Sequence, residues 1–586
     1  MMTQKGHRLD NSVHRDKRKA AADFIVEYLI HKGITDVFGY PGGMVTYLMD
    51  SFSRHSDCIS AHVTYHEQGA AFAACGYAQA SGKAGVAYAT SGPGATNLIT
   101  GICNAYFDSI PTLFITGQVN ANEAKGGYGV RQRGFQETDI VSMVKPVTKY
   151  AVYVEKVGSL PGELEKAYSM ATTGRKGPVL LDIPMNVFRE QVEVSGATAQ
   201  EQEAPRDIAD VVESASAAVR HSVSPVLLIG AGVKAAGCEE GVRKAAKRLG
   251  IPVVSSMIAF DVMQDDPHYY GFIGAYGTRA ANFIAAKSDL VISVGSRMDI
   301  RQVGFHREGF APDAKIIRFD VDPGELDYPV HANEAQFCMD MESTVRVLEA
   351  LEGGRDYGAW ISVCDEIRRL LSAIDKDSAS RMMESVGEGI PEDAVITTDV
   401  GQNQVWVAQA LKVKSGQKVL FSGGHGAMGY SLPAAIGACY GSGKKPVYCI
   451  TGDGGLQMNI QELQFIAREH LPIKIVVLNN NALGMIRHFQ EMYFDGRYFQ
   501  TRPEGGYVAP DFARIAEAYG IRSKRVEADR MEGYALTDDA PELLEILIHG
   551  DTYVLPKLEF GKPNQDQEPL IDRDLYERIM KMQPGA

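Results

Sequence analysis

The sequence lacks a cysteine pattern of the kind that builds disulfide frameworks or binds metal ions. Its eight cysteines include no C-x-x-C pair and follow no regular spacing. Most of them stand among apolar residues, which predicts buried free thiols in a reducing cytosol. We therefore expect a cytoplasmic protein without disulfide bridges.

Long hydrophobic runs and an excess of basic residues are also missing. No apolar run reaches the roughly 18 residues that a membrane span requires. The first 19 residues are charged and lack the apolar core of a secretory signal, so we expect a basic, solvent-exposed arm there. The formal net charge of −14 argues against a general binder of nucleic acid or membrane surfaces.

What the chain does contain is organised around residues 445–486. An apolar run at 447–450 ends in Thr451-Gly-Asp-Gly-Gly455, a helical pattern follows at 458–469, and an apolar run at 473–478 ends in three asparagines. Strand, glycine-rich turn, helix and strand in this order predict a βαβ unit. Ligands of such sheets bind beyond the carboxyl ends of the strands, where Asp453 and Asn480 stand.

Asp453 and Asn480 offer a carboxylate and an amide oxygen, which are hard ligands of the kind that Mg²⁺ takes together with phosphate oxygens. The glycines let the backbone approach a diphosphate, and the helix that follows points its N-terminus at the anion. A plain turn with an aspartate cap is the alternative for Gly-Asp-Gly alone. The asparagines at the end of the next strand favour the cation site.

The same alternation of strand, glycine turn and helix recurs along the whole chain. A length of 586 residues suits three or four domains. Linker-like compositions at 192–206 and at about 350–390 divide the chain into three segments. We expect an α/β protein with three doubly wound parallel-sheet domains, at 15–191, 206–350 and 380–560. A polar, glycine-rich segment at 120–133 predicts a long functional loop.

Five motifs stand out along the chain: Phe38-Gly-Tyr-Pro-Gly-Gly43, His66-Glu-Gln-Gly-Ala-Ala71, Thr90-Ser-Gly-Pro-Gly-Ala-Thr-Asn97, Phe135-Gln-Glu137, and Gly452-Asp-Gly454 with Asn479-Asn480. Taken together they resemble the thiamine-diphosphate enzymes, in particular the acetohydroxyacid (acetolactate) synthase large-subunit branch. The resemblance covers about 20–556. It implies a pyrimidine-binding, a central and a diphosphate-binding domain, in that order. It also implies active sites between the subunits of a homodimer or homotetramer.

The resemblance assigns roles to individual residues. Glu67 is implied to bond N1′ of the aminopyrimidine and so to promote removal of the C2 proton, while Gln136 and the backbone of Gly42 and Gly43 steady the intermediates. Mg²⁺ is implied to lie on Asp453, Asn480 and the carbonyl of Ala482. Further thiamine diphosphate contacts are implied at Tyr40, Thr90, Pro93, Asn97, Gly401, Gln402, Asn403, Met428, Gly452, Gly454, Gly455, Gly484 and Met485. Taken singly, Glu67 could be an N-terminal helix charge, Met428 a core residue and Gln136 a surface loop residue.

The central segment resembles the FAD-binding form of the family. The synthases do no net redox chemistry with this flavin, so FAD here is implied to be structural. A vestigial site without flavin is the alternative. The implied contacts are Arg175, Gly230, Ala231, Gly232, Ser256, Met257, Gly274, Ala275, Tyr276, Gly295, Arg297, Asp299, Arg301, Val303, Asp320, Val321 and Asp340.

The activity that the resemblance implies is decarboxylation of pyruvate and transfer of the two-carbon unit to a second 2-oxo acid. The products are of the 2-acetolactate type, which are precursors of branched-chain amino acids. The substrate side departs from the pattern, because Met185 stands where the synthases carry Lys and Phe489 where they carry a Trp that helps to choose the second oxo acid. The 120–133 loop is longer than the synthase norm and brings Arg131 and Arg133.

Three hypotheses stay open. The first is an acetolactate synthase. The second is a carboligase that transfers the acetyl unit from pyruvate to another ketone, such as a nucleotide-linked keto sugar, with the arginine loop receiving an anionic acceptor; solvated surface charge is the alternative for that loop. The third is a non-catalytic subunit, which the presence of Glu67, Asp453 and Asn480 disfavours.

Overall fold

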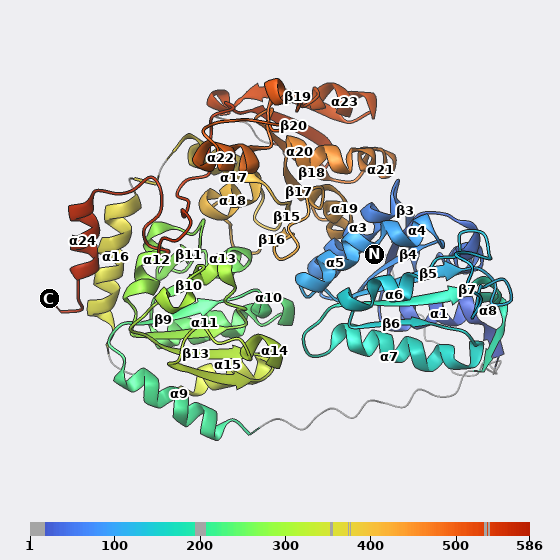
Figure 1. Ribbon diagram of the computed structural model, residues 1–586, viewed down its shortest axis with the longest axis horizontal. Coiled ribbons are helices and arrows are strands. Elements are labelled where there is room, and N and C mark those ends of the chain that lie inside the picture. The colour runs from blue at the N-terminus through green and yellow to red at the C-terminus, as the bar shows by residue number, and fades with distance from the viewer. Residues whose placement is uncertain are drawn as a thin grey trace, which may run out of the picture.

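A computed structural model describes residues 18–193, 207–351, 356–372, 374–375, 377–531, 536 and 539–585 (Figure 1). The basic arm expected at the N-terminus and most of the 192–206 linker lie outside these ranges. The described residues contain three six-stranded sheets that are parallel throughout, which confirms the α/β fold class. None of the described helices is long and apolar enough to cross a membrane.

The first sheet has the strand order β3-β2-β4-β5-β7-β6. Its strands are β2 (Asp36–Gly39), β3 (Ser60–Val63), β4 (Gly85–Ala89), β5 (Thr112–Gln118), β6 (Tyr150–Tyr153) and β7 (Pro178–Pro184). The helices of this domain are α1 (Ala21–His31), α2 (Thr46–Arg54), α3 (Glu67–Ser81), α4 (Pro93–Asn97), α5 (Ile99–Phe107), α6 (Ile140–Val144), α7 (Leu160–Thr172) and α8 (Met185–Arg189). Val86 and Ala87 are neighbours on β4 but pack into different apolar clusters. Both faces of the sheet are therefore covered, as in a doubly wound fold. A short antiparallel pair, β1 (Arg18–Ala20) and β8 (Gln191–Glu193), ties the two ends of the domain together.

The second sheet has the order β11-β10-β9-β12-β13-β14. Its strands are β9 (Pro225–Ile229), β10 (Val253–Ser255), β11 (Tyr269–Phe272), β12 (Leu290–Val294), β13 (Lys315–Asp320) and β14 (Glu334–Cys338). Its helices are α9 (Ala209–His221), α10 (Gly232–Ala236), α11 (Glu239–Leu249), α12 (Arg279–Lys287), α13 (Ile300–Val303), α14 (Pro323–Leu326), α15 (Met341–Ala350) and α16 (Gly358–Ser372). Trp360 of α16 is buried and donates its indole N–H to the carbonyl of Pro225, at a distance of 3.0 Å. The α16 segment therefore belongs to the central domain.

The third sheet has the order β16-β15-β17-β18-β20-β19. Its strands are β15 (Val395–Thr398), β16 (Lys418–Phe421), β17 (Val447–Gly452), β18 (Ile473–Asn479), β19 (Arg522–Glu527) and β20 (Glu542–Leu547). Its helices are α17 (Ser378–Glu388), α18 (Gln402–Ala410), α19 (Ser431–Gly441), α20 (Asp453–Met458), α21 (Leu463–Glu469), α22 (Gly484–Tyr493) and α23 (Phe512–Ala518). β17 and β18 are neighbours, with Gly452 in register with Leu478.

The helix predicted at 458–469 is wrong in its bounds. α20 begins directly at Asp453 and ends at Met458, and α21 begins only at Leu463 after a 3-10 turn. Asn459 interrupts the helix because its side-chain amide donates to the carbonyl of Gly429, at 2.8 Å, and its φ of −133° is not helical.

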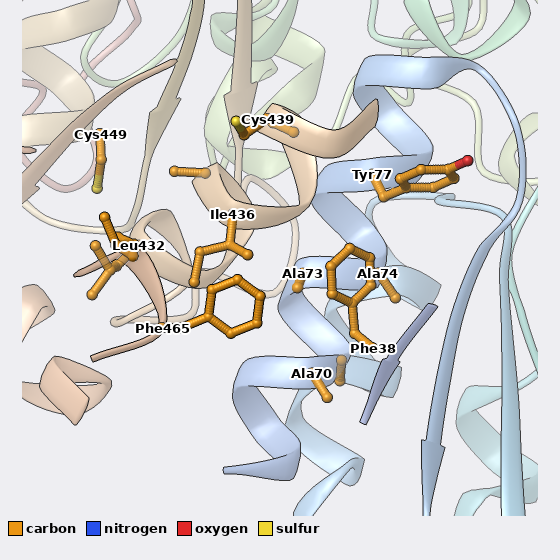
Figure 2. Close-up of a cluster of buried hydrophobic side chains, with 14 of the residues drawn as sticks. Phe38, Ala70, Ala73, Ala74, Tyr77, Leu432, Ile436, Cys439, Cys449 and Phe465 are labelled. Carbon is orange, nitrogen blue, oxygen red and sulfur yellow. The ribbon is translucent and has the colours of Figure 1, made fainter. Parts of the chain in front are cut away.

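Two helices from different domains, α3 and α19, pack side by side. α3 and α19 are rich in glycine and alanine, and a Cβ added to Gly76 or Gly437 would collide with a backbone carbonyl of the other helix. Figure 2 shows the small side chains of Ala70 and Ala73 beside Ile436 and the ring of Phe465, all in one buried cluster. The absence of side chains at these glycines is what allows the two backbones to approach.

The C-terminal segment returns to the central domain (Figure 1). The amide of Leu558 donates to the carbonyl of Ala275 at 2.7 Å, and the buried guanidinium of Arg279 donates to the carbonyls of Gln567 and Pro569 at 2.8 and 2.7 Å. Helix α24 (Arg573–Lys581) follows, with Ile579 buried in the same apolar cluster as Trp360.

All eight cysteines are free, as the sequence predicts. Cys75, Cys364, Cys439 and Cys449 are buried, whereas Cys58 and Cys338 are exposed.

Candidate active site

Asp453 and Asn480 meet at the carboxyl edge of the third sheet. Their strands, β17 and β18, are adjacent and parallel. Asp453 Oδ2 and Asn480 Oδ1 both accept the amide of Ala482, at 3.2 and 3.1 Å, so the two oxygens turn to the same point. Asp453 Oδ1 accepts the amide of Gly454 at 2.8 Å.

Burial dominates the electrostatics of Asp453. The side chain is almost fully buried, which raises the pKa of its carboxyl to about 7, and hydrogen bonds from Gly454, Ala482 and the Tyr507 hydroxyl oppose that rise. No group of three His, Cys, Asp or Glu side chains that could hold a metal ion occurs within the described ranges. A cation here would therefore have one carboxylate and one amide oxygen from the protein and take its other ligands from elsewhere, which suits Mg²⁺ with a diphosphate.

The glycines around Asp453 let neighbouring side chains pack directly against the backbone. A Cβ on Gly454 would lie 2.9 Å from Met428 Cε and from Leu483 Cδ2, and one on Gly484 would collide with the amide of Gln402. Gln402 Oε1 accepts the Asn480 amide at 2.7 Å. The predicted residues at 401–403, 428, 452–455 and 480–485 thus surround one backbone-lined cradle, which is the form of a phosphate site.

Asn403 is placed differently from the expectation. Its side-chain amide donates to Thr398 Oγ1 at 3.1 Å and to the carbonyl and Oδ1 of Asp399 at 2.8 and 3.0 Å. These donors are used inside the domain, so Asn403 fixes Asp399 instead of offering its N–H groups to the cradle.

Asp399 is a residue that sequence reasoning missed as part of the site. It is fully buried, and burial raises the pKa of its carboxyl to about 6. It accepts the amide of Gly429 at 2.7 Å and the Thr451 hydroxyl at 3.0 Å, and so joins the loop that carries Met428 to the end of β17. Its position at the carboxyl end of β15, where ligands of such sheets bind, could have identified it from the sequence.

A second cluster forms around Glu67, the first residue of α3. Its N-cap, His66, accepts the amide of Gln68 through Nδ1 at 3.0 Å. Glu67 is buried, and its Oε2 accepts the Asn97 amide at 2.9 Å. A Cβ on Gly94 would lie 3.2 Å from Glu67 Oε1, so the turn at 90–97 packs directly on the carboxylate.

Gly42 and Gln136 lie at the same edge of the first sheet. A Cβ on Gly42 would collide with Thr90, and one on Gly92 would come within 2.9 Å of Gln136 Cβ. Gln136 has a φ of 63°, an unusual value for a residue other than glycine. The structure therefore brings Gly42, Thr90, Asn97 and Gln136 together around Glu67. Gly43 begins a 3-10 turn beside them and Pro93 begins α4, while Tyr40 is 42% exposed.

Glu462 connects the two domains and was also missed. It is fully buried, its Oε1 accepts the amide of Tyr65 at 2.9 Å, and its Oε2 has no hydrogen-bond partner. Burial raises the pKa of this carboxyl to about 7. Nothing in the helical pattern at 458–469 distinguished this glutamate from a solvent-facing one.

Glu67 belongs to the first domain and Asp453 to the third. The hydrogen bonds of Glu67 stay inside the first domain and those of Asp453 inside the third, and no hydrogen bond joins the two clusters in the part of the chain that the structure describes. Each cluster on its own is half of the predicted site.

A cavity of about 1480 Å³ lies between the three domains. Most of the predicted flavin contacts line it: Arg175, Ala231, Gly232, Ser256, Met257, Ala275, Tyr276, Gly295, Arg297, Asp299, Arg301, Asp320, Val321 and Asp340. Gly230, Gly274 and Val303 do not line the cavity. Gly230 lies directly against the backbone of Gly295, so that a Cβ on Gly230 would collide with it.

Some of the polar side chains that line this cavity already have hydrogen-bond partners within the protein. Arg175 Nη1 donates to Asp322 at 2.7 Å and to Glu325 at 2.5 Å. Asp340 caps α15 by accepting the amide of Ser343 at 2.7 Å. Ser256 Oγ is buried without a hydrogen-bond partner, so one polar group of the wall is left unsatisfied.

The positions that depart from the synthase pattern belong to three different segments of the chain. Met185 is the first residue of α8. Phe489 belongs to an aromatic group with Tyr493, Phe494 and Phe560. In the 120–133 loop, Arg133 Nη1 donates to the carbonyls of Asn122 and Ala124 at 2.9 and 3.1 Å, so this guanidinium is tied within the loop.

Three family models match successive parts of the chain. Their descriptions are thiamine pyrophosphate enzyme, N-terminal TPP binding domain (19–143), central domain (212–350) and C-terminal TPP binding domain (399–548). The chain belongs to the thiamine pyrophosphate enzymes. It is 35% identical over 556 residues to the acetolactate synthase isozyme 2 large subunit of Escherichia coli K12, an alignment that covers 93% of this chain and 98% of the relative.

Other members of the family give the same picture. The acetolactate synthase large subunit of Corynebacterium glutamicum is 36% identical over 574 residues, covering 94% of this chain and 90% of the relative. The acetolactate synthase large subunit of Lactococcus lactis is 34% identical over 580 residues, covering 96% of this chain and 98% of the relative. The resemblance read from the motifs is confirmed, and it extends over nearly the whole chain.

Proposed function

We propose that the chain is a thiamine diphosphate- and Mg²⁺-dependent carboligase of the acetolactate synthase type. It decarboxylates pyruvate and transfers the two-carbon unit to a second 2-oxo acid, which gives 2-acetolactate-type products. The similarity to acetolactate synthases along nearly the whole chain supports this substrate class. The domains proposed at 15–191, 206–350 and 380–560 each contain one of the three family matches.

The observation that carries the proposal is the pairing of Asp453 and Asn480 over a glycine cradle. Two hard oxygens turned to one point, next to glycines whose backbone carries no side chain of its own, fit a cation that bridges protein and diphosphate. Asp453, Asn480 and the carbonyl of Ala482 would hold the cation. The backbone at 452–455 and 484–485 would line the phosphates.

Thiamine diphosphate, when bound, supplies the carbanion that attacks the carbonyl of pyruvate and accepts the electrons released with CO₂. The chain supplies the groups around it. Glu67 is held by Asn97 in a buried position and would accept a hydrogen bond from the aminopyrimidine at N1′. Met428, beside Gly454, would support the bend of the cofactor. Gln136, together with the backbone of Gly42 and Gly43, would orient the substrate.

FAD fits the large cavity between the domains. Its volume exceeds that of a drug-sized ligand site, and the unsatisfied Ser256 hydroxyl offers a hydrogen-bond donor in its wall. Arg175, Arg297, Arg301, Asp320 and Asp340 line the cavity and would hold the flavin. The role of the flavin would be structural.

An assembly of two or more copies of the chain is part of the proposal. Glu67 and Asp453 would contact different parts of one cofactor, and in a shared site each copy would supply one of the two residues. The ring of Phe135, next to Gln136, is 79% exposed, and Tyr40 is 42% exposed, so apolar surface surrounds the Glu67 cluster. A second copy of the chain would cover it, as a dimer or as part of a tetramer.

A different acceptor is the second candidate function. Phe489 and Met185 replace the Trp and Lys of the synthase pattern, and the 120–133 loop is long. These departures favour a ketone acceptor other than pyruvate, such as a nucleotide-linked keto sugar. We propose a cytoplasmic location for either candidate function.

Product analysis separates the two candidates. Purified protein is supplied with Mg²⁺, thiamine diphosphate and pyruvate, alone and with competing ketones. Acetolactate as the main product supports the first. Release of CO₂ with little acetolactate, but with acetylation of an added keto sugar, supports the second. No CO₂ release under any condition contradicts both and favours the non-catalytic subunit.

A further inference from the structure

Three basic side chains are buried together where the C-terminal segment passes α22. They are Arg487 at 2% exposure, His488 at 8% and Lys557 at 6%. Arg487 and His488 are consecutive on α22, and Lys557 comes from the segment that returns to the central domain. Burying positive charge is costly unless an anion pairs with it, so the partners of these groups decide what the cluster is for.

The protein supplies little negative charge to this cluster. The only carboxylate in ion-pair range among the described residues is Asp551, whose Oδ1 is 3.4 Å from Arg487 Nη1 and whose side chain is 66% exposed. Nε and Nη2 of Arg487 are buried without hydrogen-bond partners. Among the described residues no ion pair joins Lys557 to a carboxylate, and burial alone accounts for the lowered pKa of its amine.

The protonation states agree with a net positive site. Burial lowers the pKa of Lys557 only to about 8, so its amine stays mostly protonated at neutral pH. Burial, together with the charges of Lys557 and Arg487, lowers the pKa of His488 to about 4 and keeps its imidazole neutral. A neutral imidazole can donate one hydrogen bond beside the ammonium.

The backbone holds Lys557 in place. Its amide and carbonyl pair with the carbonyl and amide of Glu568, at 3.0 and 2.7 Å. The next residue, Leu558, donates to Ala275, which lines the large cavity. The His488 ring is stacked on Tyr553 at 4.1 Å. Both groups are therefore preorganised rather than free to turn into solvent.

The cluster adjoins the proposed active site. α22 begins at Gly484 in the glycine cradle, so His488 lies about one helical turn further on. Thr552, next to Tyr553, accepts the Gln402 amide at 3.0 Å. Phe489 follows His488 directly, and it occupies the position at which the synthase pattern has its acceptor-selecting Trp.

We propose that Lys557, with His488 beside it, receives the anionic group of the acceptor substrate, a carboxylate or a phosphate. This proposal rests on the proposed carboligase function and names the residue that selects the acceptor. Arg487, the residue before His488, adds a second buried positive charge to the cluster. An ammonium without a carboxylate partner gains a charge-assisted hydrogen bond when the acceptor enters, and a neutral ketone gives no such gain.

Variants at two lysines of the same segment test the proposal. Lys557→Met removes the buried ammonium, Lys557→Arg restores a cation, and Lys562→Met is the matched control because Lys562 is exposed five positions further on. The holoprotein with Mg²⁺ and thiamine diphosphate is given pyruvate and one of three acceptors: 2-oxobutyrate, dihydroxyacetone phosphate or the uncharged butanedione. CO₂ release and the KM for each acceptor are measured separately.

We expect Lys557→Met to raise KM at least about tenfold for one anionic acceptor, and which acceptor responds distinguishes carboxylate from phosphate. KM for butanedione, and the rate of CO₂ release when butanedione is saturating, should stay within about twofold, and Lys557→Arg should recover part of the loss. Equal changes for charged and uncharged acceptors, or a matching loss in affinity for thiamine diphosphate, would overturn the proposal. So would a KM that does not change.

Two further readouts do not depend on turnover. Equilibrium titration with oxalate and with inorganic phosphate should show binding to the wild type that is at least about tenfold weaker in Lys557→Met and unchanged in Lys562→Met. If the wild type releases no CO₂, the proposed function has failed and this titration still decides the anion site, because equal affinities contradict it. The midpoint of thermal unfolding without ligand should not fall in Lys557→Met, since an unpaired buried charge is removed; a marked fall indicates a structural lysine instead.

Discussion

At the scale of single residues, the proposed chemistry depends on a few buried carboxylates. Asp453, Glu67, Asp399 and Glu462 are all less than a tenth exposed. The first two were predicted because each stands in a motif with a chemical reason for a carboxylate. The other two were not, because Asp399 and Glu462 act on backbone amides that only the tertiary structure brings near.

Replacement of Glu67 tests its assigned role. Glu67→Gln keeps the shape and the Asn97 neighbour but removes the charge, so we expect CO₂ release from pyruvate to fall by about 10²–10⁴-fold with the circular dichroism spectrum unchanged. Asn97→Ala, which leaves the carboxylate in place, should cost less. Turnover of Glu67→Gln close to that of the wild type would refute the role.

Glu462 gives a prediction about pH and stability. Its pKa is about 7 in the folded chain, raised by burial above the ordinary glutamate value of 4.5, so the charged form is disfavoured by folding. The stabilising effect of the protonated group is present in full below the unfolded pKa and is lost as the pH rises through the folded one. Between pH of about 5 and about 8, the wild type should therefore lose about 1–3 kcal/mol of unfolding free energy relative to Glu462→Gln.

Thermal or urea unfolding of both proteins at several pH values measures this difference. Glu469→Gln serves as the control, because Glu469 is partly solvent-exposed and pairs with Arg468 at 2.8 Å. A difference between wild type and Glu462→Gln that does not change with pH would show that Glu462 is charged in the folded state even near pH 5.

At the scale of elements, the strands were easier to predict than the helices. The run at 447–450 became β17 with two further residues, and the strand at 473–478 gained one. Parallel strands buried on both faces read as continuous apolar runs, which are visible in a sequence. The helix at 458–469 failed because Asn459 bonds to Gly429, a contact that no local pattern reveals.

Helix packing between α3 and α19 gives a prediction at this scale. A Cβ on Gly437 would collide with the carbonyl of Ala73, so Gly437→Ala should destabilise the chain by about 1–3 kcal/mol and weaken the contact between first and third domains. Gly162→Ala in α7 is the matched control, because a Cβ there meets no atom within 4 Å. It should be neutral or stabilise by about 0.5–1 kcal/mol. Equal unfolding midpoints for the two variants would show that the helices can separate at no cost.

At the scale of the whole molecule, three similar domains each contribute residues to the proposed sites. The sequence shows the order of the domains and the family to which they belong, because their motifs are local. It does not show how the domains pack around Glu67 and Asp453. The proposal takes these two residues of one site from two copies of the chain.

Mixing two inactive variants tests the shared site. Glu67→Gln and Asp453→Ala should each be nearly inactive alone. If each site takes Glu67 from one chain and Asp453 from the other, a heterodimer has one intact site, and random mixing should restore about a quarter of the wild-type activity. The mixture is refolded or co-expressed, and CO₂ release is measured per chain. Activity that stays at the level of the single variants would place both residues in one chain's site.

The dependence of CO₂ release on added cofactors tests the central claim most directly. The purified chain is dialysed against a chelator, and release of CO₂ from pyruvate is followed while Mg²⁺ and thiamine diphosphate are added back separately and together. The account predicts release only when both are present, in the wild type and not in Asp453→Ala. Release without thiamine diphosphate, or none with both cofactors present, would contradict it.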